Sequence, residues 1–104
     1  MSPRPLSAPA ALRFEDLLNV GPATAADLRL LGLVRPADLL GQDPLALYRR
    51  LEMLTGARQD PCVLDVFIAL TRLAEGDPPT PWWHYTAERK QRYGELHPVS
   101  RKRR

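Results

Sequence analysis

A short interruption between two apolar segments is the feature of this sequence that most clearly favours ligand binding. Asn19, Val20 and Gly21 break a helical pattern, and Pro22 follows in the first turn of the next helix, where its missing N–H would have no partner. The unpaired amides at such a helix start lie at the positive end of the helix dipole and can bind an anion such as phosphate.

A phosphate can approach this turn closely only if the turn lacks bulky side chains and tolerates positive φ. Gly21 meets both requirements, and Asn19 meets the second in part, because asparagine enters the left-handed region more easily than other non-glycine residues. The alternative is a helix–helix turn that binds nothing, since such hairpins are common.

The cations divide the chain into two parts. Residues 88–104 hold seven Lys or Arg against two Glu, a net charge of +5, whereas residues 1–87 hold eight Arg against ten Asp or Glu, a net charge of −2. We therefore assign Arg89, Lys90 and Arg92, followed by the four cations of residues 101–104, to a basic tail that can bind a polyanion. The alternative is a solvated end without a ligand.

The aromatic group Trp82, Trp83 and Tyr85 allows two interpretations. It can be a stacking platform for unpaired bases or an anchor for a partner protein. It can also pack on the preceding helix and complete the core, which we favour because a small domain needs the burial. For Cys62, near a helix start, we favour a small buried residue over a reactive thiolate.

Catalytic patterns are missing from the sequence. His84 and His97 have no cysteine or carboxylate at ligand spacing, and no H-E-x-x-H, Walker-type or G-x-S-x-G motif is present. We expect neither enzymatic activity nor an organic cofactor.

The elements that would position these groups are all helical, because no segment alternates with period two. We predict an all-α fold of five short helices, or six if the last one forms. The segments are residues 14–18, 22–31, 36–40, 44–55, 61–75 and 86–93. Residues 61–75 are apolar around most of the helix and should form the central one.

Composition and breaks suggest one domain in the 104 residues. We predict a flexible leader at 1–12, a helical domain at 13–87 and the basic tail at 88–104. A single cysteine and no long apolar run lead us to expect a cytoplasmic protein that does not contact the membrane.

The stretch LLNVGPATAADLRLLGL resembles a helix-hairpin-helix motif, whose usual form is hydrophobic-x-x-Gly-hydrophobic-Gly-x-x-x-Ala. The residues that fall in place are Leu17, Val20, Gly21, Pro22, Ala25 and Leu28. Residues 14–85 as a whole, including DLLGQDPLALYRRLEMLTGARQDPCVLDVFIALTRLAEG and PWWHY, are similar to a small bacterial helix-hairpin-helix family of mitomycin-resistance-like or pathogenicity-locus proteins. That family has no well-defined activity to carry over.

The resemblance implies how the turn would work. The amides of Gly21, Ala23 and Thr24 would bind a DNA phosphate, and the carbonyls of Leu17 and Val20 would hold a monovalent cation, K⁺ or Na⁺. Two positions depart from the motif: Asn19 replaces the first glycine, and Ala23 stands where DNA-binding members often have lysine. We also assign Arg29, on the second helix of the hairpin, to the nucleic-acid surface.

Helix-hairpin-helix motifs often occur as pseudo-symmetric pairs, and residues 48–61 offer a second copy, with 36–41 as the connector. Asp60 would occupy the anion position of this second turn with its own carboxylate, so we interpret it as a structural half in which only Arg58 could reach phosphate.

The sequence therefore predicts a tandem helix-hairpin-helix domain that binds nucleic acid. We expect the nucleic acid to be DNA, and we expect the domain to contact the sugar-phosphate backbone of the DNA without sequence specificity. The alternative is a protein-interaction adaptor that docks a partner through Trp82 and Trp83 or through the tail. A net-negative domain without a lysine before Lys90 favours the adaptor. DNA against RNA, strandedness and oligomeric state stay open.

Overall fold

In the computed structural model, residues 13–97 are described, and they contain helices and turns but no strand. The elements in chain order are the 3₁₀ turn η2 (Phe14–Asp16), α1 (Pro22–Leu30), the 3₁₀ turn η3 (Pro36–Leu39), α2 (Pro44–Thr55), α3 (Pro61–Ala74), the 3₁₀ turn η4 (Trp82–Tyr85) and α4 (Thr86–Tyr93). The prediction of an all-α fold is confirmed for this part of the chain.

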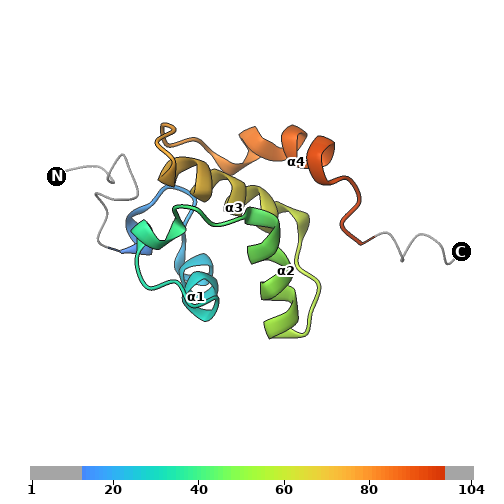
Figure 1. The fold of residues 1–104 in the computed structure, drawn as a ribbon, viewed down its shortest axis with the longest axis horizontal. Helices are drawn as coiled ribbons and strands as arrows, with labels where there is room; N and C mark the ends of the chain where they lie inside the picture. The colour runs from blue at the N-terminus through green and yellow to red at the C-terminus, as the bar shows by residue number, and fades with distance from the viewer. Residues whose placement is uncertain (1–12, 98–104) are drawn as a thin grey trace, which may run out of the picture.

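Helix α3 is the centre of the fold, with α1 and α2 on one side of it and α4 on the other (Figure 1). Its sequence explains this position, because nine of its fourteen residues are buried, far more than a surface helix presents. Every other element except α4 adds buried residues to the core around it. The largest fully buried apolar side chains are Phe14, Leu17, Leu28, Leu39, Tyr48, Leu51, Leu64, Phe67, Ile68 and Leu70.

The starts of α2 and α3 follow from the Asp-Pro pairs in the sequence. The Asp43 carboxylate accepts a hydrogen bond from the Leu45 amide (3.2 Å), and the Asp60 carboxylate accepts one from the Cys62 amide (3.1 Å). Gly56 ends α2 with φ of 70°, the left-handed conformation that glycine adopts at least cost. These three boundaries were predictable because each depends on local chemistry alone.

Two predicted helices are single 3₁₀ turns. After Asp16, Leu17 is extended (φ −88°, ψ 146°) and Asn19 has φ of 78°, so residues 14–18 cannot form a continuous α-helix. Residues 36–40 shorten to η3 (Pro36–Leu39) because Leu40 is extended. The described chain therefore has four α-helices, and not the expected five or six. The other two predicted helices correspond to the 3₁₀ turns η2 and η3.

The C-terminal segment belongs to the folded unit up to His97. Helix α4 crosses the boundary that we predicted at residue 87, and beyond it Leu96 is 6% exposed, with its carbonyl 2.9 Å from an Arg49 guanidinium nitrogen. Residues 88–97 are therefore not a tail. The predicted leader at 1–12 and the cations of residues 101–104 lie outside the described residues. Within 13–97, no helix combines the length and apolarity needed to cross a membrane.

Candidate nucleic-acid interface

The hairpin turn, residues 19–24, has its left-handed residue at Asn19 and not at Gly21. Asn19 has φ of 78°, whereas Gly21 is extended (φ −98°, ψ −173°), a conformation open to any residue. A Cβ added to Gly21 would meet no atom within 4 Å. The fold therefore does not require glycine at position 21: the tolerance of positive φ that we expected of Gly21 is used by Asn19 instead.

The backbone at the start of α1 faces solvent and has unused donors. The first amide bonded within the helix is that of Ala25, which donates to the Gly21 carbonyl at 2.9 Å. The amides of Ala23 and Thr24 precede it and so have no helical acceptor. Gly21 and Ala23 are exposed and Thr24 is half-buried, so an anion can reach this helix start.

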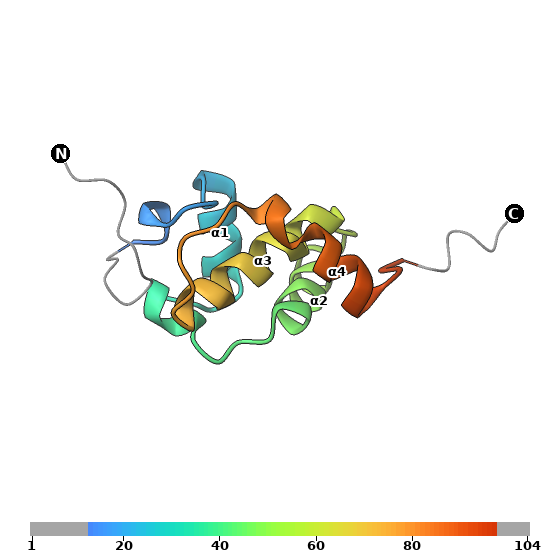
Figure 2. The same ribbon diagram turned by 90° about the horizontal axis from the view of Figure 1, so that it is seen from above.

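The Asn19 side chain joins the hairpin turn to a segment about sixty residues further along the chain. Its Nδ2 donates to the Thr80 carbonyl (2.9 Å), and its Oδ1 accepts from the Trp82 amide (3.1 Å). Figure 2 shows the chain after α3 turning back along α3 before it reaches η4 and α4. Asparagine at this position therefore has two roles that glycine could not combine: it adopts the left-handed backbone and clamps the second segment.

The aromatic residues after this clamp differ in burial. Tyr85 is 6% exposed and belongs to the core, as predicted, and Trp82 is half-buried. Trp83 is 64% exposed, with its ring 5.7 Å from that of Trp82 in an edge-to-face arrangement. The interpretation that all three aromatics complete the core is wrong for Trp83.

Arg29 stands in the last turn of α1 and is already paired. Its guanidinium donates two hydrogen bonds to the Glu15 carboxylate (2.9 and 3.0 Å) and lies over the Phe14 ring. The hydrogen bond from Arg29 lowers the pKa of Glu15 to about 2. This pair fastens η2 to α1, and the guanidinium would have to exchange Glu15 for phosphate in order to bind DNA.

Arg89 forms a buried ion pair and is not part of a cationic surface. Its Nε lies 2.7 Å from Oδ1 of Asp65, which is fully buried in α3, and the Arg89 side chain is only 11% exposed. The Thr86 hydroxyl donates to the other Asp65 oxygen at 2.7 Å. Arg72 and Glu88 form a second ion pair between the same two helices. These contacts fix α4 on α3.

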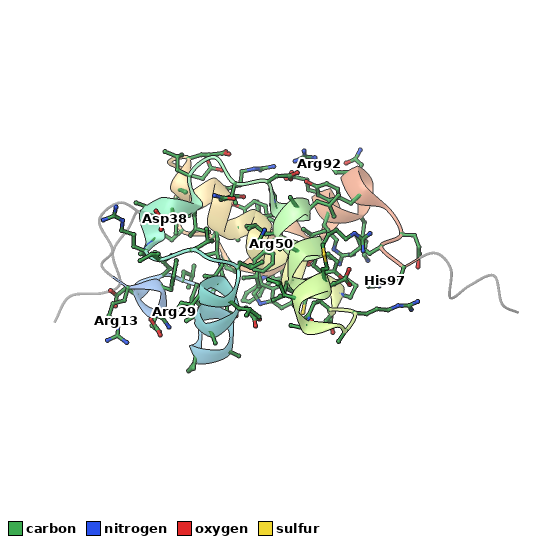
Figure 3. The ribbon with its side chains drawn as sticks, turned by 60° about the horizontal axis from the view of Figure 1, so that its bottom comes forward. Arg13, Arg29, Asp38, Arg50, Arg92 and His97 are labelled. Carbon is green, nitrogen blue, oxygen red and sulfur yellow. The ribbon has the colours of Figure 1, made fainter. Side chains whose placement is uncertain are left out.

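The remaining predicted cations are scattered. Arg92 pairs with Glu88 (3.3 Å), while Arg58 and Lys90 are exposed and have no ion pair within residues 13–97. In Figure 3 Arg29 lies at the lower left of the molecule and Arg92 at its upper right. The structure thus does not gather Arg29, Arg58 and Arg92 beside one turn.

The predicted cation ligands are backbone carbonyls. The Leu17 carbonyl accepts a hydrogen bond from the Val20 amide at 3.3 Å. Among residues 13–97, no three His, Cys, Asp or Glu side chains are grouped so that they could hold a metal ion.

The second turn, residues 56–60, is closed by its own side chains. The buried Tyr48 hydroxyl donates to the Gln59 carbonyl, and the Glu52 carboxylate accepts the Gln59 amide at 3.0 Å. Asp60 caps α3, as predicted. Cys62 is half-buried, and burial together with the Asp60 carboxylate raises the pKa of its thiol, which disfavours a thiolate.

Sequence reasoning missed Glu52, which ties the end of the described chain to α2. Its carboxylate lies 2.6 Å from His97 Nε2 and 2.9 Å from an Arg49 nitrogen. Burial raises the pKa of Glu52, but the Gln59 amide, His97 and Arg49 outweigh it and lower the pKa to about 2.

Glu52→Gln should destabilise the protein at neutral pH and lose this effect in acid. The folded state favours the charged carboxylate, so its stabilisation is present above the unfolded pKa of 4.5 and disappears as pH falls towards about 2. Urea unfolding of both proteins at pH 7, 4 and 3, followed by circular dichroism, checks this. Curves that differ equally at all three pH values would contradict it.

Comparison with known proteins identifies the family of this chain. Residues 7–91 match the pathogenicity locus (Cdd1) family. The chain is 44% identical, over 75 residues, to the mitomycin resistance protein McrB of Streptomyces lavendulae, an alignment that covers 72% of this chain and 71% of that protein. No solved structure matches the chain. The family match includes most of α4, the helix that packs on α3. Because the match spans most of the sequence, this chain belongs to the pathogenicity locus (Cdd1) family.

Proposed function

We propose that this protein binds nucleic acid, and that its ligand is DNA. It would hold a phosphate of the DNA backbone at the hairpin turn, without sequence specificity. The observation that carries the proposal is the exposed start of α1, where the Ala23 and Thr24 amides have no helical acceptor and Gly21 leaves open space that the fold does not use. Contacts of this kind position a protein on the backbone and read no bases.

In this proposal the chain is a tandem helix-hairpin-helix domain with unequal halves. Residues 14–30 form the binding half, in which the 3₁₀ turn η2 stands in for the first helix. Helices α2 and α3 form the structural half, because Gln59 and Asp60 fill the second turn with protein contacts. The η3 turn connects the two halves.

The charges support only weak binding by the described part of the chain. Arg29, Arg89 and Arg92 are paired with carboxylates, so Arg58 and Lys90 are the predicted cations within residues 13–97 that stay available. We therefore propose that residues 101–104 add charge without fixing the position of the strand, and that affinity falls steeply with salt. A K⁺ or Na⁺ ion on the Leu17 and Val20 carbonyls would add a further contact. The proposal includes no catalysis and no organic cofactor.

Gly21→Val should weaken DNA binding by at least about tenfold, because its side chain would fill the approach to two amides whose bonds to a charged phosphate are worth about 1.5–3 kcal/mol each. The extended φ of Gly21 admits valine without strain. Fluorescence anisotropy of labelled DNA over a salt series measures the loss, and circular dichroism shows whether the helices are intact.

Ala57→Val is the matched control, since it places the same valine side chain on the exposed second turn and should leave affinity unchanged. A further variant with the four cations of residues 101–104 changed to glutamine separates the tail from the turn. It keeps Leu96 and His97, which contact α2, whereas a chain ending at Tyr93 would lose them. Equal affinity of Gly21→Val and wild type would exclude the turn as the binding site.

The second candidate function is a protein-interaction adaptor. The 64% exposure of Trp83 favours it, because a large exposed aromatic ring is typical of an anchor in a protein interface. No DNA binding at low salt by the wild-type protein would favour the adaptor over the DNA-binding module.

A further inference from the structure

Trp83 is an exposed aromatic ring on a fixed support. The ring is 64% exposed, yet the neighbouring Trp82 amide is bonded to Asn19 and the two indoles pack edge to face. On the other side, Tyr85 is buried against the core and Thr86 is bonded to Asp65. The backbone at Trp83 is thus held at both ends, so a ligand would meet a ring whose position is already set.

Among the described residues of η4 and α4, Trp83 is the one large exposed apolar side chain. The remaining large exposed apolar side chains of the described chain are Leu30, Val34, Leu40, Met53 and Leu54, none of which belongs to η4 or α4. A protein interface buries about 800 Å² on each partner around a central apolar cluster. A single exposed ring without such a cluster fits a single flat partner better, and a nucleobase has that shape.

The distance between the ring and the hairpin turn limits how many nucleotides can separate the bound phosphate from the base that stacks on the ring. The Trp82 amide is 3.1 Å from the Asn19 side chain, Asn19 is two residues from Gly21, and Trp83 is the next residue after Trp82. Because consecutive Cα atoms are 3.8 Å apart, the Cα atoms of Trp83 and Gly21 lie within about 20 Å of each other. A few nucleotides of one strand can span that distance.

Charge in this region suits an anionic strand. Lys90 on α4, the helix that follows η4, is exposed and pairs with no carboxylate within residues 13–97. Lys90 therefore adds a cation on the helix that follows the ring.

We propose that Trp83 stacks on an unpaired base of the strand whose phosphate is held at the hairpin turn, so that the preferred ligand is single-stranded or locally melted nucleic acid. This inference rests on the proposed function and narrows it, because bases paired and stacked within a duplex cannot cover the ring. It also gives the Asn19 clamp a role in binding, since the clamp sets where the ring stands.

The test compares Trp83→Ala with Met53→Ala, a control that removes a large apolar side chain from α2 that is 77% exposed. Binding of a labelled oligothymidylate and of a duplex of the same length is measured by anisotropy. Loss of one stacked base, about 1–3 kcal/mol, corresponds to an affinity of Trp83→Ala for the single strand that is weaker by about 5- to 150-fold. Duplex affinity should stay within twofold, and Met53→Ala should match wild type on both.

Gly21→Val, measured beside them, separates the two proposals. If Trp83→Ala binds the oligothymidylate as tightly as wild type while Gly21→Val does not, stacking is excluded, the turn remains the binding site, and Trp83 is left for a protein partner. If Trp83→Ala loses single-strand affinity and Gly21→Val does not, stacking stands and the turn does not bind phosphate. Equal losses of Trp83→Ala on single strand and duplex would also overturn stacking.

Discussion

Arg89→Met should lower the free energy of unfolding by about 3–5 kcal/mol, because it leaves a buried carboxylate without its counter-ion. Asp65 is fully buried in α3, and its two oxygens are bonded to Arg89 and Thr86 at 2.7 Å each. Methionine keeps much of the apolar stem that packs between α3 and α4, so the loss reports the charge and not a cavity. Urea unfolding followed by circular dichroism measures it.

Lys90→Met is the matched control, because Lys90 is the next residue on α4, exposed and outside any ion pair of the described chain. It should change stability by no more than about 0.5 kcal/mol. The double variant Asp65→Leu with Arg89→Met should recover part of the loss, since it removes the unpaired charge. If Arg89→Met were no more destabilising than the control, the pair would be open in solution and Arg89 free for DNA.

The different environments of Arg89 and Lys90 could not be predicted from the sequence. Arg89 and Lys90 are neighbours of the same charge, and only the three-dimensional packing assigns one to the interior and the other to the surface. A signal was present in α3, where Asp65 stands between Leu64 and Val66 in a run that is otherwise apolar from residue 61 to residue 70. A carboxylate there needs a buried partner. The sequence does not say which of the later arginines supplies it.

The boundaries of α2, α3 and α4 could be predicted because their signals are local. Asp-Pro starts, the Gly56 stop and the apolar periodicity act within a few residues, and the structure places them as expected. Residues 14–18 were assigned to a helix from apolar spacing, which a 3₁₀ turn followed by an extended residue satisfies as well, since Phe14 and Leu17 are both buried. Spacing alone does not separate the two.

The sequence predicted the backbone conformation of Asn19 but not its side-chain hydrogen bonds. Its tolerance of positive φ follows from residue type and was expected, but its two side-chain bonds cross more than sixty residues to Thr80 and Trp82. The partner segment, residues 77–81, contains three prolines, which lack N–H groups and cannot form regular secondary structure. Such a segment needs an external hydrogen-bonding partner, but its identity depends on the tertiary fold.

Asn19→Ala should lower the free energy of unfolding by about 2–5 kcal/mol. Two partly buried hydrogen bonds contribute about 0.5–1.5 kcal/mol each, and alanine in the left-handed region adds about 1–2 kcal/mol. Asn19→Gly keeps the backbone conformation and should lose only the hydrogen bonds. Gln42→Ala, which removes an exposed side-chain amide with one local bond, is the control and should change stability by less than about 1 kcal/mol. Urea unfolding of the three variants gives the ranking.

Asn19→Gly also tests why this turn departs from the helix-hairpin-helix pattern, because it restores the first glycine and removes the clamp. If the clamp positions Trp83, the variant should bind duplex DNA at least as well as wild type and bind oligothymidylate more weakly. The reason is that the phosphate site is kept while the ring loses its fixed position. If Asn19→Gly were as stable as wild type and bound both ligands equally well, the two side-chain bonds would have no weight in solution, and asparagine would serve only the left-handed backbone.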